Sequence, residues 1–436
     1  MAAEGGAGAA AATLARRGVA ELAVLARSEP VDDVTLAQSK EIVTAVREGG
    51  EAALRELAVK FGDVEEGKPI VVTAAELEAA YKSLPEEQQA LLQRVASRVR
   101  AFAEAQRASL TAMETTVPGG RAGHTVAPVD TAGCYAPGGR YPLPSSVIMT
   151  VLTARVAGVK QVWVASPRPS PVTLAAAHVS GADAMLAVGG AQAIAAMAYG
   201  VGPVPSCDVI VGPGNRWVTA AKALVSGRCA IDMLAGPSEC LVLADDTAKP
   251  DVVAADLLAQ AEHDVDALPI LVTVDESLVA KVEAELTAQL ATLPTADVAR
   301  VAVRRGYAVV CGSMDEAIAA CDTVAPEHLE VMVRDADEVA KRLNHYGGLF
   351  VGGVSAEVFG DYGAGPNHVL PTVSTARYTG GLSVFTFLRV RTYLRLDEGA
   401  GAGAGAEAAA LARDSAALAR LEGLEGHARA AEKRLG

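Results

Sequence analysis

The histidines are the residues of this sequence most able to do chemistry, because imidazole both binds metal ions and transfers protons near neutral pH. There are seven, and each by itself is more often a core or surface residue than a ligand. Four of them stand beside acids, amides or glycines that suit a functional site. These four are His263, His328, His368 and His427.

Gln260 and His263 lie three residues apart near the end of a helix predicted over residues 251–263. Residues three apart share one face of a helix. An imidazole nitrogen and a carboxamide oxygen can therefore point at one metal ion. An ordinary polar helix end explains the same pair, and for this pair alone it is the favoured interpretation.

Glu327 and His328 follow Pro326 at a predicted transition from strand to loop. In a loop, adjacent side chains can both enter a cleft, and a carboxylate beside an imidazole suits two separate proton transfers. An ordinary charged loop explains these residues about as well.

The segment GDYGAGPNHVLPT sets Asp361, Asn367 and His368 among three glycines and two prolines. Glycine and proline favour a rigid loop that presents polar side chains. A purely structural loop needs the turn residues but neither Asn367 nor His368, so the segment indicates function.

Near the C-terminus, the segment EGLEGH interrupts a helical pattern with two glycines between Glu422 and His427. A pair of glycines costs a helix roughly 2 kcal/mol relative to alanine. This cost favours a functional role for the acid and the imidazole. A surface position on a mobile tail is the alternative for His427.

Composition limits what kind of protein these residues serve. The chain has 436 residues, which predicts two or three domains. A net charge of −14 argues against a surface that follows nucleic-acid phosphates and suits an enzyme with a small substrate. The six cysteines form no CxxC pair, which excludes a zinc finger and indicates reduced core thiols. We therefore expect the cytoplasm, or a plastid if the source is a plant or alga.

No membrane segment is expected. The 24 residues between Asp183 and Asp208 carry no charge, but glycines and prolines divide them into strand, turn and helix. The N-terminus lacks the compact apolar run of a secretory signal.

The elements that must position the candidate residues follow an alternating pattern. Residues 34–110 show helical spacing, and beyond residue 145 short apolar strands alternate with helices. This pattern predicts an α/β fold with two doubly wound, incomplete Rossmann-like parallel-sheet domains and a helical C-terminal tail. Ligands of such sheets bind beyond the carboxyl ends of the strands, where the glycine-rich turns 189–190 and 212–215 fall.

Eight segments in order resemble the histidinol dehydrogenase family, and together they span most of the chain. They are CYAPGGRYPLPSSV (134–147), GGAQAIAAMAYG (189–200), GPGN (212–215), IDMLAGPSE (231–239), DLLAQAEHD (256–264), APEHLE (325–330), GDYGAGPNHVLPT (360–372) and EGLEGH (422–427).

The resemblance implies a role for each matching residue. The implied zinc ligands are Gln260, His263, Asp361 and His427, and the implied general bases are Glu327 and His328. The implied NAD contacts are Tyr135, Gln192 and Asn215. The implied substrate contacts are Ser238, His328, His368 and Glu422, together with the four zinc ligands.

The implied activity is the oxidation of L-histidinol to L-histidine through an enzyme-bound aldehyde, with one Zn²⁺ per subunit and two NAD reduced in turn. The sequence contains no GxGxxG, so NAD is expected on the GPGN turn. Two nitrogens and two oxygens suit zinc without thiolates. The resemblance also implies a homodimer in which Glu422 and His427 reach the partner's site.

The resemblance divides the chain into four parts. Residues 1–30 form an N-terminal helix or arm, and residues 31–130 with 239–380 form the domain that carries zinc and the catalytic residues. Residues 131–238 form the domain that binds NAD. Residues 381–436 form a helical arm exchanged across the dimer.

Two other functions compete with this hypothesis. A zinc hydrolase that uses Glu327 or Glu262 to activate water would explain the metal residues but leaves the segments at 134, 189 and 212 without a role. An inactive relative kept as a structural dimer is the other, but every proposed catalytic position is filled.

Overall fold

The computed structural model describes residues 11–25, 31–138, 142–397 and 402–434. The chain divides into two compact units, one of residues 1–104 with 130–387 and one of residues 105–129 with 388–436. The first unit contains two six-stranded sheets and nearly all the candidate residues.

The first of these sheets has the strand order β2-β7-β6-β5-β8-β9. Its strands are β2 (Val71–Thr73), β5 (Thr131–Tyr135), β6 (Gln161–Ala165), β7 (Ala184–Leu186), β8 (Val209–Val211) and β9 (Ala230–Ile231). All neighbours are parallel except β2, which runs antiparallel to β7. We call it the β5 sheet. The chain crosses from one side of β5 to the other between β7 and β8.

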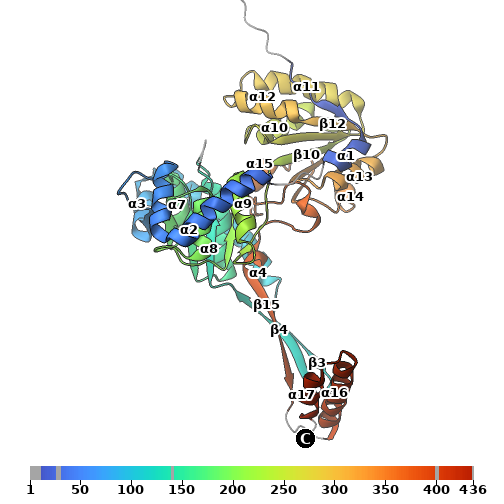
Figure 1. Cartoon of the computed structure of the whole chain (residues 1–436). Coiled ribbons are helices and arrows are strands. Elements are labelled where there is room, and N and C mark those ends of the chain that lie inside the picture. The colour runs from blue at the N-terminus through green and yellow to red at the C-terminus, as the bar shows by residue number, and fades with distance from the viewer. Residues whose placement is uncertain (1–10, 26–30, 139–141, 398–401, 435–436) are drawn as a thin grey trace, which may run out of the picture. The chain divides into compact units, whose positions relative to one another are not determined.

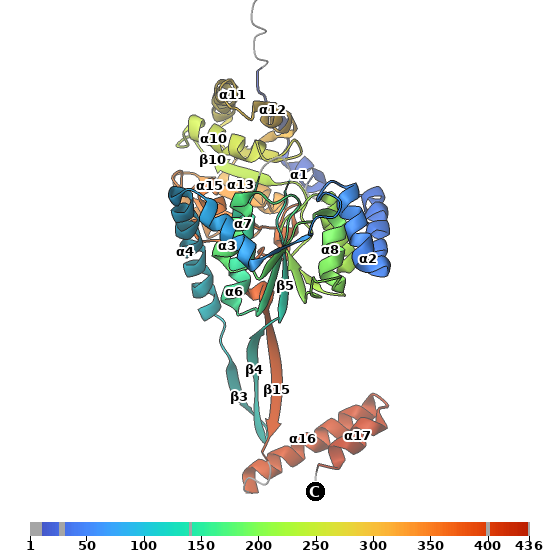
Figure 2. The ribbon, with the colours of Figure 1, turned by 90° about the vertical axis from the view of Figure 1, so that its left-hand side faces the viewer.

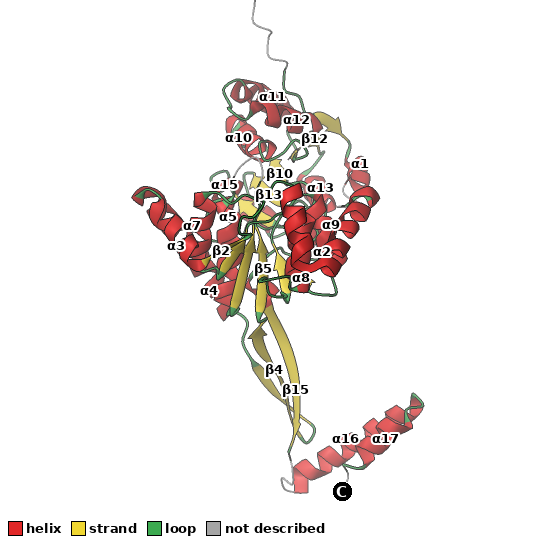
Figure 3. Ribbon diagram, turned by 60° about the vertical axis from the view of Figure 1, so that its left-hand side comes forward, coloured by secondary structure: helices red, strands yellow, loops and turns green. Residues whose placement is uncertain are grey.

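Helices cover both faces of the β5 sheet, as Figure 3 shows. One face carries α2 (Asp33–Lys60), α8 (Gly190–Tyr199) and α9 (Arg216–Val225), and the other carries α3 (Ala74–Ser83) and α7 (Pro171–Ser180). A continuous helical stretch joins α5 (Pro144–Val147), a π-helical turn (Ile148–Leu152) and α6 (Thr153–Ala157). The first unit also contains most of α4 (Glu86–Ala108), whose last residues, 105–108, belong to the second unit.

The second sheet has the order β1-β12-β11-β10-β13-β14, and all its pairs are parallel. Its strands are β1 (Ala15–Arg17), β10 (Glu239–Ala244), β11 (Leu268–Thr273), β12 (Tyr307–Val310), β13 (His328–Met332) and β14 (Gly348–Val351). We call it the β10 sheet. The predicted α/β class with two parallel-sheet layers is therefore confirmed.

Helices also lie on both faces of the β10 sheet (Figure 1). One face carries α10 (Pro250–Ala261), α11 (Glu276–Leu290) and α12 (Ala296–Arg305), and the other carries α1 (Val19–Leu25), α13 (Met314–Val324) and α14 (Ala336–Ala340). The short α15 (Glu357–Asp361) and two 3₁₀ turns (Thr375–Arg377 and Val384–Phe387) complete the unit. The cores are built from Ala, Val and Leu, as the low aromatic content predicts.

The packing of α2 and β2 differs from the expected domain division. Val43, Val46 and Leu54 of α2 belong to the core of the β5 sheet, and β2 is one of its strands. The buried residues of α2 form a stripe that packs against α8. Sequence periodicity predicts such a stripe but not the sheet that it will cover. The functional division into NAD and zinc domains stays a proposal.

The second unit contains an antiparallel sheet that we did not predict. Its order is β15-β4-β3, with β3 (Met113–Val117), β4 (Gly120–Pro128) and β15 (Leu388–Leu396), and it is followed by α16 (Ala402–Leu421) and α17 (Glu425–Glu432) (Figure 2). The expected all-helical arm from residue 381 is therefore wrong for β15. The strand LRVRTYLRL alternates charged and apolar residues, which is the period of a strand and not of a helix.

Candidate active site

Glu327 and His328, the predicted general bases, lie at the amino ends of the strands of the β10 sheet. β13 begins at His328, which is in register with Cys240 of β10. Glu239, the first residue of β10, therefore lies beside Glu327, which immediately precedes β13. Glu327 and His328 therefore stand at the beginning of a strand, whereas the sequence predicted that they follow one. Ligand residues at amino ends are unusual for a parallel sheet, and here the loops between the sheets bring the remaining residues to this edge.

A backbone carbonyl sets the tautomer of His328. The Nδ1 atom of His328 lies 3.0 Å from the Glu239 carbonyl oxygen and 3.2 Å from Gln260 Oε1. Because a carbonyl only accepts, Nδ1 carries the proton and donates. His328 Nε2 is then a lone-pair nitrogen, buried and without a hydrogen-bond partner among the described residues. Burial lowers the pKa of His328 to about 3, so the imidazole stays neutral.

Glu327 is held by the same stretch of backbone. Its Oε2 accepts a hydrogen bond of 2.9 Å from the Glu239 amide, and only 6% of the residue is exposed. Burial raises the pKa of Glu327 well above its usual range. A carboxylate with a raised pKa is a stronger base, which suits proton abstraction.

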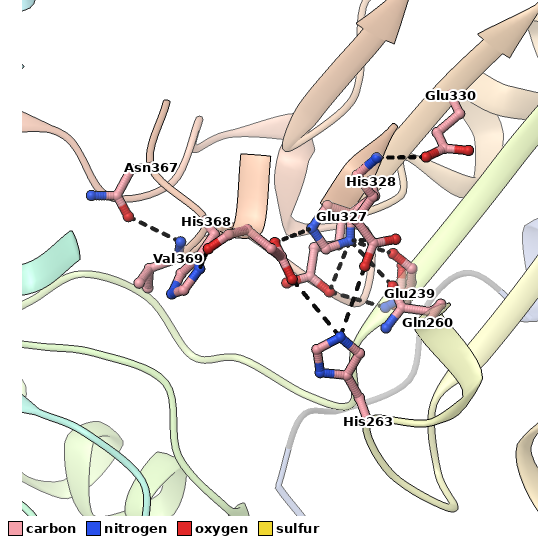
Figure 4. Close-up of polar contacts among 11 residues, drawn as sticks. Glu239, Gln260, His263, Glu327, His328, Glu330, Asn367, His368 and Val369 are labelled. Atoms are coloured by element: carbon pink, nitrogen blue, oxygen red, sulfur yellow. Dashed lines mark hydrogen bonds and ion pairs between the residues drawn. The ribbon is translucent and has the colours of Figure 1, made fainter. Parts of the chain in front are cut away.

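Three of the four predicted metal ligands converge beside His328. His263 Nε2 lies 3.8 Å from Asp361 Oδ2, and His328 Nε2 lies 3.7 Å from Asp361 Oδ1. Gln260 reaches the same place through its contact with His328, as Figure 4 shows. Burial raises the pKa of Asp361 to about 6.

The end of α10 explains how Gln260 and His263 arrive there. A helix between parallel strands runs back toward their amino ends, so its last residues reach the edge that holds Glu327. The helix ends at Ala261, and the His263 amide donates to the Gln260 carbonyl at 3.3 Å in the following turn. The sequence predicted that the two residues share one face of a helix. This prediction is wrong, because the helix ends before His263. The turn after the helix aims His263 instead.

His368 lines a cavity together with Glu327. The Nδ1 atom of His368 donates to the Asp361 carbonyl at 2.9 Å, which leaves Nε2 as an acceptor, and burial lowers its pKa to about 4. The cavity has a volume of about 100 Å³, and its lining includes Gly212, Gly214, Ser238, Glu327 and His368. Ser238 and His368, both predicted substrate contacts, thus face one space.

Asn367 holds the loop that carries His368. Its side-chain nitrogen donates to the Met149 carbonyl at 2.9 Å and to Thr153 Oγ1 at 3.2 Å. Its oxygen accepts from the Val369 amide, as Figure 4 shows. The residue that indicated function in the sequence therefore anchors a loop to the π-helical turn.

The residues predicted to hold NAD lie at the carboxyl edge of the β5 sheet. The hydroxyl of Tyr135 accepts from the Gly190 amide at 3.1 Å, and Gln192 Nε2 donates to Asp63 at 3.1 Å. Asn215 lies across β5, where its side-chain oxygen caps α9 by accepting from the amides of Trp217 and Val218. This use leaves the Asn215 amide nitrogen for a ligand.

Glu239 and Glu357 are buried acids of the site that the sequence analysis missed. Glu357 Oε1 lies 3.9 Å from His263 Nε2, and its Oε2 lies 3.8 Å from His328 Nδ1. Glu357 precedes Asp361 by four residues on α15, a spacing that points both at one place. That spacing was a readable signal. Nothing in the sequence distinguished Glu239 from a surface glutamate.

Glu422 and His427 belong to the second unit. Glu422 follows the end of α16, and His427 lies in the first turn of α17. Both residues are exposed in that unit. Their contribution to a site stays a prediction.

Comparisons with known proteins bear on the whole chain. A family profile described as histidinol dehydrogenase matches residues 25–435. Histidinol dehydrogenase of Thermus thermophilus is 46% identical over 396 residues, which are 90% of this chain and 93% of that protein. Sulfopropanediol 3-dehydrogenase of Ruegeria pomeroyi is 44% identical over 405 residues, which are 91% of each.

Among solved structures, histidinol dehydrogenase from Elizabethkingia anophelis matches with a TM-score of 0.89 at 31% identity and covers 98% of both chains. No helix in the described ranges combines the length and apolar character needed to cross a membrane. The resemblance drawn from eight segments is confirmed, because the family match spans nearly the whole sequence. This chain belongs to the histidinol dehydrogenase family of oxidoreductases.

Proposed function

We propose that this chain is a zinc-dependent L-histidinol dehydrogenase that reduces two NAD as it converts L-histidinol to L-histidine through a bound aldehyde. The observation that carries the proposal is the His328 Nε2 atom. It is a buried, unprotonated nitrogen without a partner in the described structure, beside Asp361 and Glu327. The lone pair of such an atom is free to accept the hydroxyl hydrogen of a substrate.

The donor set fits a zinc ion. Two donors about 2 Å from a tetrahedral zinc lie roughly 3.3 Å apart, and His263 Nε2 and Asp361 Oδ2 are 3.8 Å apart. Gln260 is fully buried, and its carboxamide oxygen, which lies 3.2 Å from His328 Nδ1, is the atom of this side chain that could bind the ion. Gln260, His263 and Asp361 would hold the ion, with His427 of the partner subunit as the fourth ligand. When bound, zinc would orient the amine and imidazole of histidinol.

His328 and Glu327 divide the proton transfers. In the first oxidation His328 accepts the hydroxyl proton while the carbon gives a hydride to NAD, which yields the aldehyde and NADH. In the second, Glu327 removes a proton from water as the water adds to the aldehyde. The resulting hydrate then loses a hydride to a second NAD and a proton to a base, which gives the acid. The geometry supports this because Glu327 lines the cavity and its Oε2 lies 3.8 Å from His328 Nδ1.

The charge of the site bears on the substrate, since a sulfopropanediol dehydrogenase is nearly as similar as the histidinol dehydrogenases. The ion pairs of Glu327, Glu357 and Asp361 within the described residues are with histidines only. Lys222, which lines the cavity, is neutralised by Asp232. An acidic site favours a cationic amino alcohol over a sulfonate.

The dimer, the cofactor and the compartment belong to the same proposal. Leu418, Leu421 and Leu424 are exposed on the second unit, which suits a segment that packs on another subunit. The GPGN turn lines the cavity and would receive NAD. All six cysteines are buried and free, consistent with a reducing compartment such as the cytoplasm.

The test is an assay of the purified zinc-loaded protein with L-histidinol and NAD, followed by NADH absorbance. We expect about two NADH per histidinol, from the two hydride transfers that the proposal requires. An absence of NADH would refute the proposal. Sulfopropanediol in place of histidinol is the matched substrate control, and equal rates with both would contradict the charge argument.

A further inference from the structure

Three loops meet at the carboxyl edge of the β5 sheet around Asp63. Asp63 lies between α2 and β2, and its Oδ2 accepts from the Gly189 amide at 3.0 Å and from Gln192 Nε2 at 3.1 Å. A Cβ atom on Gly189 would lie 2.7 Å from the Pro167 ring, so the loops after β6 and β7 are in contact. Asp63 thus joins a place built from the ends of three strands.

The strand order says which part of a dinucleotide comes to this place. β8 lies on one side of β5, and β6 and β7 lie on the other. Gly212 and Gly214, after β8, line the cavity that contains Glu327 and His368, so the reacting nicotinamide belongs there. A dinucleotide lies across the switch point of such a sheet. The adenosine half therefore extends past β5 toward Tyr135, Gln192 and Asp63.

The carboxylate of Asp63 has one oxygen available. Both of its side-chain hydrogen bonds in the described structure use Oδ2, and the residue is half-buried. Burial raises its pKa, while the bonds from Gly189 and Gln192 and the charge of Arg168 oppose this. Oδ1 is thus a fixed acceptor at the edge of the nucleotide site.

Arg168 is the cation whose charge acts on this carboxylate and favours its ionised form. It lies in the loop after β6, next to Pro167, and its side chain is exposed. Its backbone adopts a φ of 45°, in the left-handed region that non-glycine residues rarely occupy. The loop therefore holds Arg168 in an unusual conformation beside the edge that Asp63 occupies.

We propose that Asp63 makes this protein select NAD over NADP by accepting a hydrogen bond from the adenosine 2′-hydroxyl and repelling a 2′-phosphate. Arg168 is the counterpart, which would bind a 2′-phosphate once the carboxylate of Asp63 is removed. An acid on the ribose hydroxyl and an arginine on the phosphate are the two ways in which nucleotide sites distinguish these cofactors. The inference rests on the proposed function, because it takes the β5 sheet as the NAD site.

The test compares Asp63→Asn, Asp63→Asn with Arg168→Ala, and the wild type in kcat/KM for NAD and for NADP. We expect Asp63→Asn to lower the ratio of NAD to NADP efficiency at least about tenfold, mainly through the two KM values, because a hydrogen bond to a charged group and a repulsion are both lost. Adding Arg168→Ala should remove most of the gain with NADP. Glu66→Gln is the control, because it removes an equal charge from an exposed site in the same loop.

If Asp63→Asn changes kcat/KM for NAD and for NADP by the same factor, the inference is overturned, because Asp63 would then only position Gln192. Asp63→Ser, which also removes the charge, gives the same comparison if the asparagine variant folds poorly. Binding of NADH and NADPH, followed by fluorescence without substrate, uses the same variants and separates the two proposals. If the wild type fails to oxidise histidinol, the proposed function fails, and the NADH to NADPH affinity ratio still decides the role of Asp63.

Discussion

At the scale of single residues, the site works through groups whose protonation the fold has fixed. His328 is neutral because it is buried, and its free nitrogen is Nε2 because Nδ1 donates to the Glu239 carbonyl. Glu327 sits on the amide of the same residue. One residue of backbone therefore orients both proposed bases.

Exchanging each base separately should divide the two oxidations. His328→Gln keeps a donor for the Glu239 carbonyl but loses the basic nitrogen, and we expect both steps to slow by about 10²-fold or more. Glu327→Gln should slow aldehyde oxidation at least tenfold more than alcohol oxidation. Stopped-flow NADH formation from L-histidinol and from L-histidinaldehyde measures the two steps. Equal damage by Glu327→Gln to both would contradict the division of roles.

Glu239 gives a stability prediction with a definite sign. Burial raises its pKa from 4.5 to about 7, so the folded state prefers the neutral acid. The neutral carboxyl group of Glu239 makes its full contribution to the free energy of unfolding below pH 4.5, and this contribution is lost as the pH rises through 7. Glu239→Gln should therefore gain stability relative to the wild type between pH 5 and 8, by up to roughly 3 kcal/mol. Urea unfolding of both proteins at the two pH values measures this, and a constant difference would show that Glu239 does not titrate as described.

At the scale of elements, the turn after β8 is fixed by a buried ion pair. Lys222 of α9 pairs with Asp232 after β9, and both side chains are almost fully buried. Asp232 accepts from the Gly212 amide at 2.7 Å, and Lys222 donates to the Gly212 carbonyl at 3.1 Å. Gly212 has a φ of 114°, and a Cβ there would lie 2.0 Å from the Tyr135 carbonyl. The pair thus holds both sides of a glycine at which no other residue fits.

Lys222→Met should reveal the cost of leaving Asp232 without its partner. Removing one member of a buried pair leaves an uncompensated charge, and we expect a loss of about 3 kcal/mol in unfolding free energy. Adding Asp232→Asn should recover part of this loss. Lys160→Met is the control, because its pair with Asp130 is exposed and should contribute under about 1 kcal/mol. Equal losses in Lys222→Met and Lys160→Met would mean that the buried pair does not stabilise the turn.

At the scale of the whole molecule, the proposed site needs a residue from the second unit. Gln260, His263 and Asp361 would supply three of the proposed ligands within the first unit, and zinc in proteins usually has four. His427 lies on a unit whose leucines are exposed. Dimerisation and zinc affinity are therefore linked in the proposal.

Subunit exchange tests whether His427 acts in trans. The inactive homodimers of His328→Gln and His427→Ala, mixed and allowed to exchange, should recover about one quarter of wild-type activity, since half of the dimers would have one intact site. Zinc affinity of the His427→Ala dimer, measured by chelator competition, should fall at least tenfold. If exchange is complete by mass spectrometry and no activity returns, His427 acts within its own subunit.

The sequence by itself predicted the α/β class, the order of most strands and helices, and the family. These follow from local information, because apolar periodicity sets each element and a short motif is a string of neighbours. Gln260, His263, Glu327, His328, Asp361 and His368 were all found as candidates, since their residue types already suit metal binding or proton transfer.

Only the tertiary structure decided how these groups behave. Every residue has a backbone carbonyl, so the sequence could not show which tautomer His328 adopts. It also could not show the burial that neutralises Glu239. The amino-edge position of the site and the contact of Asp63 with Gln192 depend on residues more than 80 apart in sequence coming together. The alternation of LRVRTYLRL indicated a strand at β15 that the expected helical arm overlooked, but its pairing with β4, far away in the sequence, was decided by the tertiary structure. The residue types identified the candidate groups, and long-range packing determined their protonation states and their neighbours.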